Sequence, residues 1–253
     1  MKRFDSEMKR MLHGLNLTWV LENIDEELAN AARKHFSCEE FLQRLLAGET
    51  DIRDTRAVER KIRTAQLHNQ HYTLEQYDFA YPVKINADLV HHLFRLDFLR
   101  ENKNIVFIGR VGLGKTHLAK ALAYEACKKR HSVLCVTAVE LVNMLIKAAS
   151  EKKLEEAISK YTKPQVLLVD ELGYIPFDRT ASELLFQVFA RRYDSPCAST
   201  IITTNRAFKE WTKIFANDAV LTSAVLDRIV HRCEIVVIEG KSYRMRKVLT
   251  AEK

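Results

Sequence analysis

A glycine-rich segment at residues 109–116 constrains the fold of this chain more than any other feature. It reads Gly-Arg-Val-Gly-Leu-Gly-Lys-Thr and follows directly on the apolar run at 105–108. In such a segment the N–H groups of a tight turn and of a helix N-terminus converge on an anion, because they lack partners within the helix. Lys115 can reach the outer phosphates of a nucleotide, and the Thr116 hydroxyl can ligate Mg²⁺. The predicted phosphate-binding residues are Gly109, Arg110, Val111, Gly112, Leu113, Gly114, Lys115, Thr116 and His117.

From about residue 73 onward, apolar runs of strand length alternate with helical patterns. The runs are rich in β-branched residues and almost continuously apolar, as expected of strands covered by helices on both faces. The sequence therefore predicts an α/β fold with a parallel sheet flanked by helices. We expect the last of the intervening helices to begin with a capping box of Thr180 and Glu183. The expected strands are 104–108, 133–137, 166–170, 200–204 and 235–238, and the expected helices lie near 115–130, 138–149 and 179–193.

Residues 1–72 contain no proline and show helical periodicity. The polar stretch at 68–71 is expected to be a linker, since no carboxylate or cysteine joins its two histidines at metal-ligand spacing. We therefore expect a small all-helical domain at 1–72 that binds a partner or DNA, followed by the α/β domain at 73–253. The first two helices are expected near 5–15 and 19–34.

A third helix is expected to begin at Ser37, where Glu40 stands at capping-box spacing, and to end at Gly48. Beyond it, four arginines lie three or four residues apart and would share one face of a helix. This face has two interpretations: a solvated surface with acidic neighbours, or a surface that follows the phosphates of DNA. The four residues are Arg53, Arg56, Arg60 and Arg63.

A second motif stands about fifty residues after the glycine-rich segment. The apolar strand at 166–169 leads into Asp170 and Glu171. Asp170 at the strand tip can hold Mg²⁺, and Glu171 can orient and deprotonate an attacking water. The following strand ends in Asn205, whose amide can polarise that water or touch the γ-phosphate, or can simply cap the chain. These residues predict a hydrolytic site that uses a nucleotide and Mg²⁺.

Composition limits the possible partners and compartments. The chain of 253 residues carries a formal net charge of +7, which favours a polyanion such as nucleic acid, although 33 acidic residues are interspersed. Its five cysteines include no Cys-x-x-Cys pair, which argues against a disulfide framework and a zinc ribbon. No apolar stretch reaches membrane-spanning length, and residues 1–5 do not lead into an apolar signal core. We expect a soluble protein of the reducing cytoplasm, without a membrane partner.

Several segments in combination resemble the IstB-like transposition helper ATPases of insertion sequences, which are AAA+ P-loop proteins close to the DnaC-type helicase loaders. The resemblance extends over nearly the whole chain. It is carried by Asp170-Glu-Leu-Gly-Tyr-Ile-Pro, Lys115-Thr-His-Leu-Ala, Thr204-Asn-Arg, Leu226-Asp-Arg-Ile-Val-His, Glu239-Gly-Lys-Ser-Tyr-Arg, Phe36-Ser-Cys-Glu-Glu-Phe-Leu and Arg56-x-x-x-Arg60-x-x-Arg63.

This resemblance implies an ATP- and Mg²⁺-dependent ATPase that assembles head-to-tail as a homo-oligomer on double-stranded DNA and hands a target site to a cognate transposase. Arg228 matches the arginine finger, which reaches the γ-phosphate of a neighbouring subunit's nucleotide. Arg244 matches the second sensor, which contacts phosphate within its own subunit. A positioned guanidinium stabilises the negative charge that develops on the transferring phosphoryl group. One departure is Arg110, where similar proteins usually have proline.

Two other functions stay open at this point. A DnaC-like helicase loader has the same architecture, although the arginine face at 53–63 and the match in the N-terminal half favour DNA and a transposase. A small-molecule kinase uses the same phosphate loop, but Glu171 suits the activation of water, and the sequence shows no obvious acceptor-binding lid.

Overall fold

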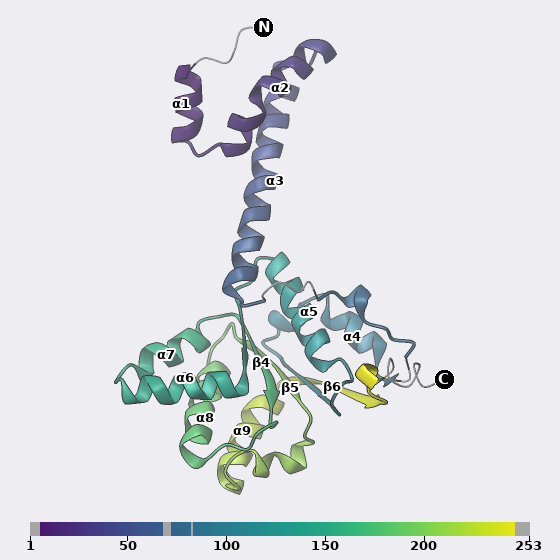
Figure 1. Cartoon of the computed structure of the whole chain (residues 1–253), viewed down its shortest axis with the longest axis vertical. Helices are drawn as coiled ribbons and strands as arrows, with labels where there is room; N and C mark the ends of the chain where they lie inside the picture. Colours follow the sequence, from purple (N-terminus) through teal and green to yellow (C-terminus); the bar gives the residue numbers. More distant parts are fainter. Residues whose placement is uncertain (1–5, 68–71, 82, 246–253) are drawn as a thin grey trace. The chain divides into compact units, whose positions relative to one another are not determined.

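The computed structural model describes residues 6–67, 72–81 and 83–245 (Figure 1). The expected linker at 68–71 lies outside these residues. The chain divides into two compact units, Met1–Arg60 and Lys61–Lys253, which are described separately below. This division falls earlier in the chain than the domain boundary near residue 72 that the sequence indicates, and that boundary stays a prediction.

The first unit is helical, as its periodicity predicts. It contains α1 (Ser6–Gly14), α2 (Thr18–Lys34) and the greater part of α3 (Cys38–Thr64). The predicted capping box precedes α3: the Ser37 N–H donates to Glu40 Oε2 at 2.8 Å, and the Glu40 N–H donates to Ser37 Oγ at 3.2 Å. The predicted start of this helix is therefore confirmed.

Gly48 does not end the third helix, contrary to the expectation from the sequence, because α3 continues through it. A Cβ atom at position 48 would collide with the ring of Trp19, so the glycine permits close packing. The next residue, Glu49, is only 3% exposed and accepts hydrogen bonds from the N–H groups of Trp19 at 2.9 Å and Val20 at 3.3 Å. These contacts satisfy donors that the start of α2 leaves unpaired, and they outweigh the cost of about 1 kcal/mol for a glycine inside a helix.

The second unit is built on a sheet with the strand order β1-β6-β2-β5-β4-β3. The strands from β6 to β3 in this order run parallel, whereas β1 pairs antiparallel with β6. The predicted parallel sheet is confirmed, and β1 was missed because a two-residue strand has no periodicity to recognise. The strands are β1 (Val83–Lys84), β2 (Asn104–Gly109), β3 (Val133–Thr137), β4 (Val166–Leu172), β5 (Ser199–Thr204) and β6 (Cys233–Gly240).

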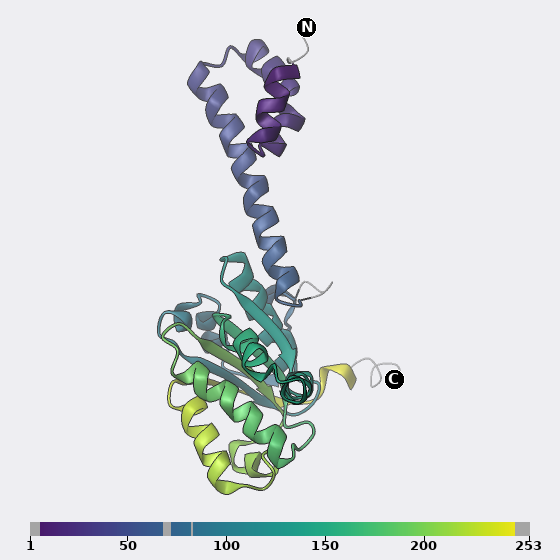
Figure 2. The same cartoon turned by 90° about the vertical axis from the view of Figure 1, so that its left-hand side faces the viewer.

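Each face of this sheet has its own hydrophobic core, because successive strand residues point to opposite faces. Val106 and Val169 belong to one core, and their neighbours Ile105 and Leu168 belong to the other. On the first face, α8 and α9 lie side by side in both views (Figures 1 and 2). No helix of the described ranges is long and apolar enough to cross a membrane. The first face is covered by α6 (Ala138–Ser150), α7 (Leu154–Thr162), α8 (Arg179–Tyr193) and α9 (Ala219–Val230), and the second by α4 (Ala87–Leu93) and α5 (Lys115–Lys128).

Helix α8 does not begin with the expected capping box of Thr180 and Glu183. Asp178 is the N-cap, and its carboxylate accepts a hydrogen bond from the Ala181 N–H at 2.8 Å. Glu183 instead pairs with Arg179 at 2.9 Å. The start of the helix is thus set by the Asp178 cap, and the residue before Asp178 is held in addition by a backbone hydrogen bond to the carbonyl of residue 214.

The strand order brings together the glycine-rich loop after β2, the acidic end of β4 and the end of β5, all at the carboxyl ends of the parallel strands. Strand β5 lies between β2, which ends at Gly109, and β4, which contains Asp170 and Glu171. Ligands of open parallel sheets bind outside the carboxyl ends of the strands. The candidate site is therefore expected at the carboxyl ends of these strands.

Candidate functional site

The glycine-rich loop joins β2 to α5 in the conformation that a phosphate cradle requires. Gly112 and Gly114 adopt positive φ angles of 80° and 85°, which side chains rarely tolerate. A Cβ at position 112 would meet Ser242 Oγ, and one at position 114 would lie 2.5 Å from the Tyr77 ring. Both glycines are thus required by backbone conformation and by close neighbours, and the loop presents the N-terminus of α5 to the pocket.

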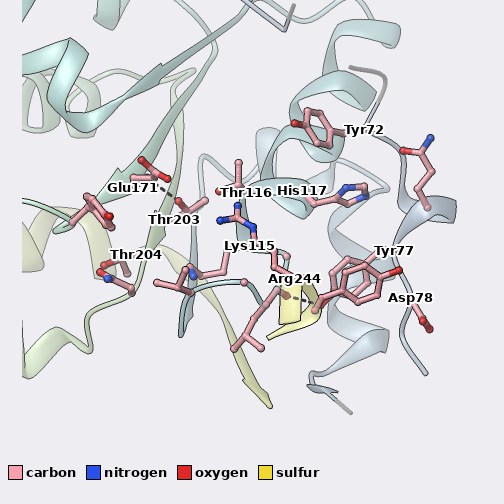
Figure 3. A pocket seen from close by; sticks show the side chains of 18 residues that line it. Tyr72, Tyr77, Asp78, Lys115, Thr116, His117, Glu171, Thr203, Thr204 and Arg244 are labelled. Atoms are coloured by element: carbon pink, nitrogen blue, oxygen red, sulfur yellow. Dashed lines mark hydrogen bonds between the residues drawn. The ribbon is translucent and has the colours of Figure 1, made fainter. Parts of the chain in front are cut away.

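Lys115 lies at the centre of the pocket (Figure 3). Its ammonium donates a hydrogen bond of 2.8 Å to the carbonyl of Arg110, whose own side chain is exposed. Burial lowers the pKa of the Lys115 ammonium from its usual value, and the charge of Arg244 lowers it further, while Asp170 and Glu171 act in the opposite direction. A partly desolvated cation beside unpaired helix N–H groups attracts an anionic ligand.

Thr116 and Asp170 link the glycine-rich loop to β4. The Thr116 hydroxyl donates to Asp170 Oδ1 at 2.9 Å, and Asp170 is only 5% exposed. A hydroxyl and a carboxylate are hard oxygen ligands of the kind that Mg²⁺ prefers when it binds together with nucleotide phosphates. The described residues contain no group of three or more His, Cys, Asp or Glu side chains at metal-binding distance. The donor set therefore fits Mg²⁺ bound jointly with a nucleotide, rather than a metal cage built from protein side chains alone.

Glu171 occupies an irregular position at the end of β4. The pairing of β4 with β5 shifts register between Val169 and Leu172, and Glu171 has a φ angle of 60°. Its side chain is exposed and lines the pocket, whereas both neighbours in the chain are buried. A left-handed backbone at a non-glycine residue is uncommon and concentrates at functional sites.

Asn205 and Arg244 also line the pocket, although they come from different parts of the chain. Asn205 directly follows β5. Arg244 lies in a short 3-10 turn, Tyr243–Met245, that is attached to the glycine-rich loop, since the Tyr243 N–H donates to the Gly112 carbonyl at 2.8 Å. The structure thus brings the predicted second sensor to the same pocket as Lys115.

An aromatic wall made of Tyr72, Tyr77 and His117 lines the pocket. His117 was predicted as the last residue of the phosphate-binding segment, whereas Tyr72 and Tyr77 were not predicted from the sequence. In Figure 3 this wall lies on one side of Lys115, and Glu171 lies on the other. The rings of Tyr72 and Tyr77 lie 5.2 and 6.0 Å from that of His117. Burial raises the pKa of Tyr77 to about 12, and its hydroxyl donates to the Leu113 carbonyl at 3.1 Å. The other lining residues that sequence reasoning missed are Gln76, Asp78, Tyr174, Thr203, Thr204 and Tyr243.

Arg228 lies outside this pocket. It is in the last turn of α9, where its guanidinium carbon is 4.9 Å from the centre of the Phe186 ring and its Nη1 donates to the Ala224 carbonyl at 3.0 Å. The structure of one chain therefore does not bring this arginine to the phosphate loop of the same chain.

The four arginines of the predicted DNA-binding face are all on α3 but differ in their contacts. Arg53 is held within the first unit: its Nε donates to Glu49 Oε1 at 3.0 Å, and its Nη2 donates to the Asn16 carbonyl at 2.9 Å. The side chains of Arg56, Arg60 and Arg63 are exposed. The hydrogen bonds of Arg53 to Glu49 and to the Asn16 carbonyl stabilise the first unit.

Known proteins resemble this chain over nearly its whole length. A family model described as IstB-like ATP binding protein matches residues 10–251. The chain is 37% identical over 242 residues to a Geobacillus stearothermophilus protein named as an ATP-binding protein of insertion sequence IS5376, with 95% of each chain covered. It is 35% identical over 241 residues to a protein of Pseudomonas aeruginosa named as an ATP-binding protein of insertion sequence IS21, which covers 95% of this chain and 89% of that protein.

Solved structures show the same fold. AMPPCP-bound DnaA from Aquifex aeolicus superposes with a TM-score of 0.55 at 21% identity, over 72% of this chain and 55% of that one. The DnaC helicase loader superposes with a TM-score of 0.54 at 22% identity, over 66% of this chain and 97% of that one. The second unit thus has the fold of the AAA+ P-loop ATPases.

Proposed function

Because the chain belongs to the family of IstB-like ATP-binding proteins, we propose that it is an ATPase that assembles on double-stranded DNA and assists a cognate transposase in selecting a target site. The names of its relatives support ATP binding and an association with insertion sequences. The observation that carries the proposal is the convergence of Lys115, Thr116 and Glu171 on one pocket, where Thr116 is bonded to Asp170. The likeness to a helicase loader concerns the fold alone.

In the proposed mechanism the protein binds ATP through its phosphates and activates water. The loop N–H groups and Lys115 hold the phosphates, while Thr116 and Asp170 hold Mg²⁺, which when bound would neutralise phosphate charge. Glu171 accepts a proton as water attacks the γ-phosphorus, the bond from that phosphorus to the bridging oxygen breaks, and ADP and phosphate result. Asn205 orients the water, and Arg244 stabilises the charge that develops on the phosphoryl group.

The aromatic wall suits the base of the nucleotide. Tyr72, Tyr77 and His117 offer apolar ring surfaces within the same pocket as the loop. Planar rings gain from offset or edge-on contact with a base, and a few polar groups then fix its orientation. This wall supports a nucleotide as the ligand, over a simple phosphate or a phosphorylated sugar.

A neighbouring subunit supplies Arg228 in this proposal, so the chain acts as a head-to-tail homo-oligomer. The position of Arg228 outside its own pocket supports this arrangement. An arginine supplied in trans accelerates phosphoryl transfer by about 10³- to 10⁵-fold, so an isolated subunit should hydrolyse ATP poorly.

Double-stranded DNA is the proposed platform for this assembly. The net charge of +7 and the exposed Arg56, Arg60 and Arg63 support a phosphate-rich partner. All five cysteines are free thiols, which fits the reducing cytoplasm in which we place the protein.

The test is phosphate release at increasing protein concentration, with and without double-stranded DNA. We expect turnover per subunit to rise steeply with both, because each site is completed by a neighbour. Turnover that is unchanged by dilution and by DNA would contradict the mechanism. In a parallel pull-down against the cognate transposase and a replicative helicase, we expect retention of the transposase; retention of the helicase alone would contradict the assigned role.

A further inference from the structure

Thr203 connects the two acidic residues of the candidate site, although it is not part of either motif. It is the penultimate residue of β5 and is only 1% exposed. Its hydroxyl donates to Asp170 Oδ1 at 2.5 Å. It also accepts a hydrogen bond from the Glu171 N–H at 2.9 Å (Figure 3). A hydroxyl carries one hydrogen and two lone pairs, and the backbone N–H can only donate, so the hydrogen of Thr203 is committed to Asp170.

The hydrogen bond from the Glu171 N–H to Thr203 takes the place of a ladder hydrogen bond between β4 and β5. The register between β4 and β5 shifts between Val169 and Leu172, so the Glu171 N–H lies at an interruption of the ladder. A partly buried backbone donor without a partner is unfavourable, and the left-handed φ of 60° at Glu171 adds strain. The Thr203 hydroxyl supplies the partner and thereby stabilises the backbone conformation that turns the Glu171 side chain into the pocket.

We propose that Thr203 is a positioning residue, which sets the direction of Glu171 for water activation and of Asp170 for Mg²⁺. The inference rests on the proposed ATPase function and adds a residue to it. Asp170 Oδ1 accepts from both Thr116 and Thr203, but Thr203 belongs to the sheet and not to the phosphate loop. Its bond therefore persists when the Thr116 hydroxyl turns to a metal ion, and the carboxylate keeps its orientation.

The adjacent residue, Thr204, makes a different hydrogen bond. Thr204 is also buried, but its hydroxyl accepts a hydrogen bond from the Arg206 N–H at 3.1 Å and so stabilises the local turn after β5. Only the first threonine of the pair links β5 to the acidic end of β4 in this way. The contrast assigns the positioning role to residue 203 specifically.

The experiment compares Thr203→Val, which removes the hydroxyl at nearly constant volume, with Thr203→Ser, which keeps it. We expect Thr203→Val to lower kcat about 100-fold with little change in KM, because a misplacement of about 1 Å can cost that much. Thr203→Ser should retain most of the wild-type rate. Thr162→Val is the control, since its hydroxyl donates to the Ile158 carbonyl within α7 and Thr162 does not line the pocket; its rate should equal that of the wild type.

A second readout does not depend on turnover. The affinity for a non-hydrolysable ATP analogue is measured in EDTA and in Mg²⁺ for the same variants. Thr203→Val should bind as the wild type does in EDTA but should lose the gain in affinity that Mg²⁺ brings, and Thr203→Ser should keep that gain. If Thr203→Val does not fold, as judged by circular dichroism, Thr203→Ala takes its place in both assays.

Three outcomes overturn the inference. The first is a wild-type kcat and a wild-type Mg²⁺ response in a folded Thr203→Val or Thr203→Ala variant. The second is a loss of kcat and Mg²⁺ response in Thr203→Ser that equals the loss in Thr203→Val, and the third is such a loss in Thr162→Val. Failure of the proposed function is distinguishable, because then the wild type itself releases no phosphate. In that case the Mg²⁺-dependent affinities of the variants still decide whether Thr203 places Asp170.

Discussion

The hydroxyl of Thr116 donates a 2.9 Å hydrogen bond to Asp170 Oδ1, which joins the start of α5 to the end of β4. The two residues are 54 positions apart in the chain. They meet because Thr116 follows the loop after β2, and only β5 lies between β2 and β4 in the sheet. Through this bond the residue that ends the phosphate loop and an acidic residue near the end of β4 form one oxygen-rich site.

Replacing Lys115 with Ala should weaken ATP binding by about 1.5–3 kcal/mol, the contribution of hydrogen bonds to a charged group. This corresponds to about a 10- to 150-fold higher Kd. Isothermal titration with a non-hydrolysable analogue measures the change. Lys129→Ala, at an exposed lysine just beyond α5, is the matched control and should bind normally. Equal affinities for Lys115→Ala and the wild type would remove the lysine from the site.

Glu171→Gln should bind ATP but hydrolyse it about 10²- to 10⁴-fold more slowly, because the amide cannot accept the proton of the attacking water. The substitution keeps the size of the side chain and leaves its backbone bond to Thr203 intact. We expect the variant to remain on DNA in the presence of ATP, which sedimentation with labelled duplex detects. Hydrolysis at the wild-type rate would exclude Glu171 as the base.

Mixing two inactive variants should restore activity if Arg228 acts on a neighbouring subunit. The Arg228→Ala variant keeps every residue that lines its own pocket, and the Glu171→Gln variant keeps Arg228 on α9. In a mixed assembly an Arg228→Ala pocket can receive the arginine of a Glu171→Gln neighbour, so phosphate release should exceed the sum of the two separate preparations. A double variant with both changes is the control and should restore nothing. An absence of recovery in the mixture, with assembly demonstrated by light scattering, would argue that Arg228 does not act in trans.

Arg192→Leu should destabilise the second unit by about 3 kcal/mol or more. The guanidinium is 2% exposed and donates to the carbonyls of Tyr161 at 3.0 Å, Pro164 at 2.8 Å and Ser199 at 2.7 Å. Burial lowers the pKa of this arginine, but the carbonyl oxygens compensate the charge, and leucine would leave them unpaired.

Urea unfolding measures this loss against Arg191→Leu, the neighbouring position on α8. Arg191 is 44% exposed in its side chain and pairs with Glu155, a surface contact that solvent screens and that contributes little to stability. Similar midpoints for the two variants would show that the buried network around Arg192 contributes little.

Neutralising Arg56, Arg60 and Arg63 together should reduce the slope of log Kd against log salt for double-stranded DNA by about 0.9 for each phosphate that the variant no longer neutralises. The slope is obtained from binding isotherms at several salt concentrations. Arg53→Gln is the comparison, because its guanidinium is bonded to Glu49 and to the Asn16 carbonyl; it should lower the stability of the first unit and leave the slope unchanged. An unchanged slope in the triple variant would identify the face as merely solvated.

Most of the α/β fold and the phosphate loop could be predicted from the sequence because their determinants are local. A phosphate cradle needs glycines at fixed offsets within eight consecutive residues, and a buried parallel strand needs a continuous apolar run. The same holds for the capping box of Ser37 and Glu40, whose partners are three residues apart.

Tertiary structure alone decided the features that depend on residues far apart in the chain. Gly48 lies inside a helix because Trp19 packs on it. The aromatic wall and the bond from Thr203 to Asp170 likewise have no signature in local periodicity. Such contacts form only when the sheet order places distant segments side by side, so the sequence determined which chemistry the chain carries, and the fold determined which residues position it.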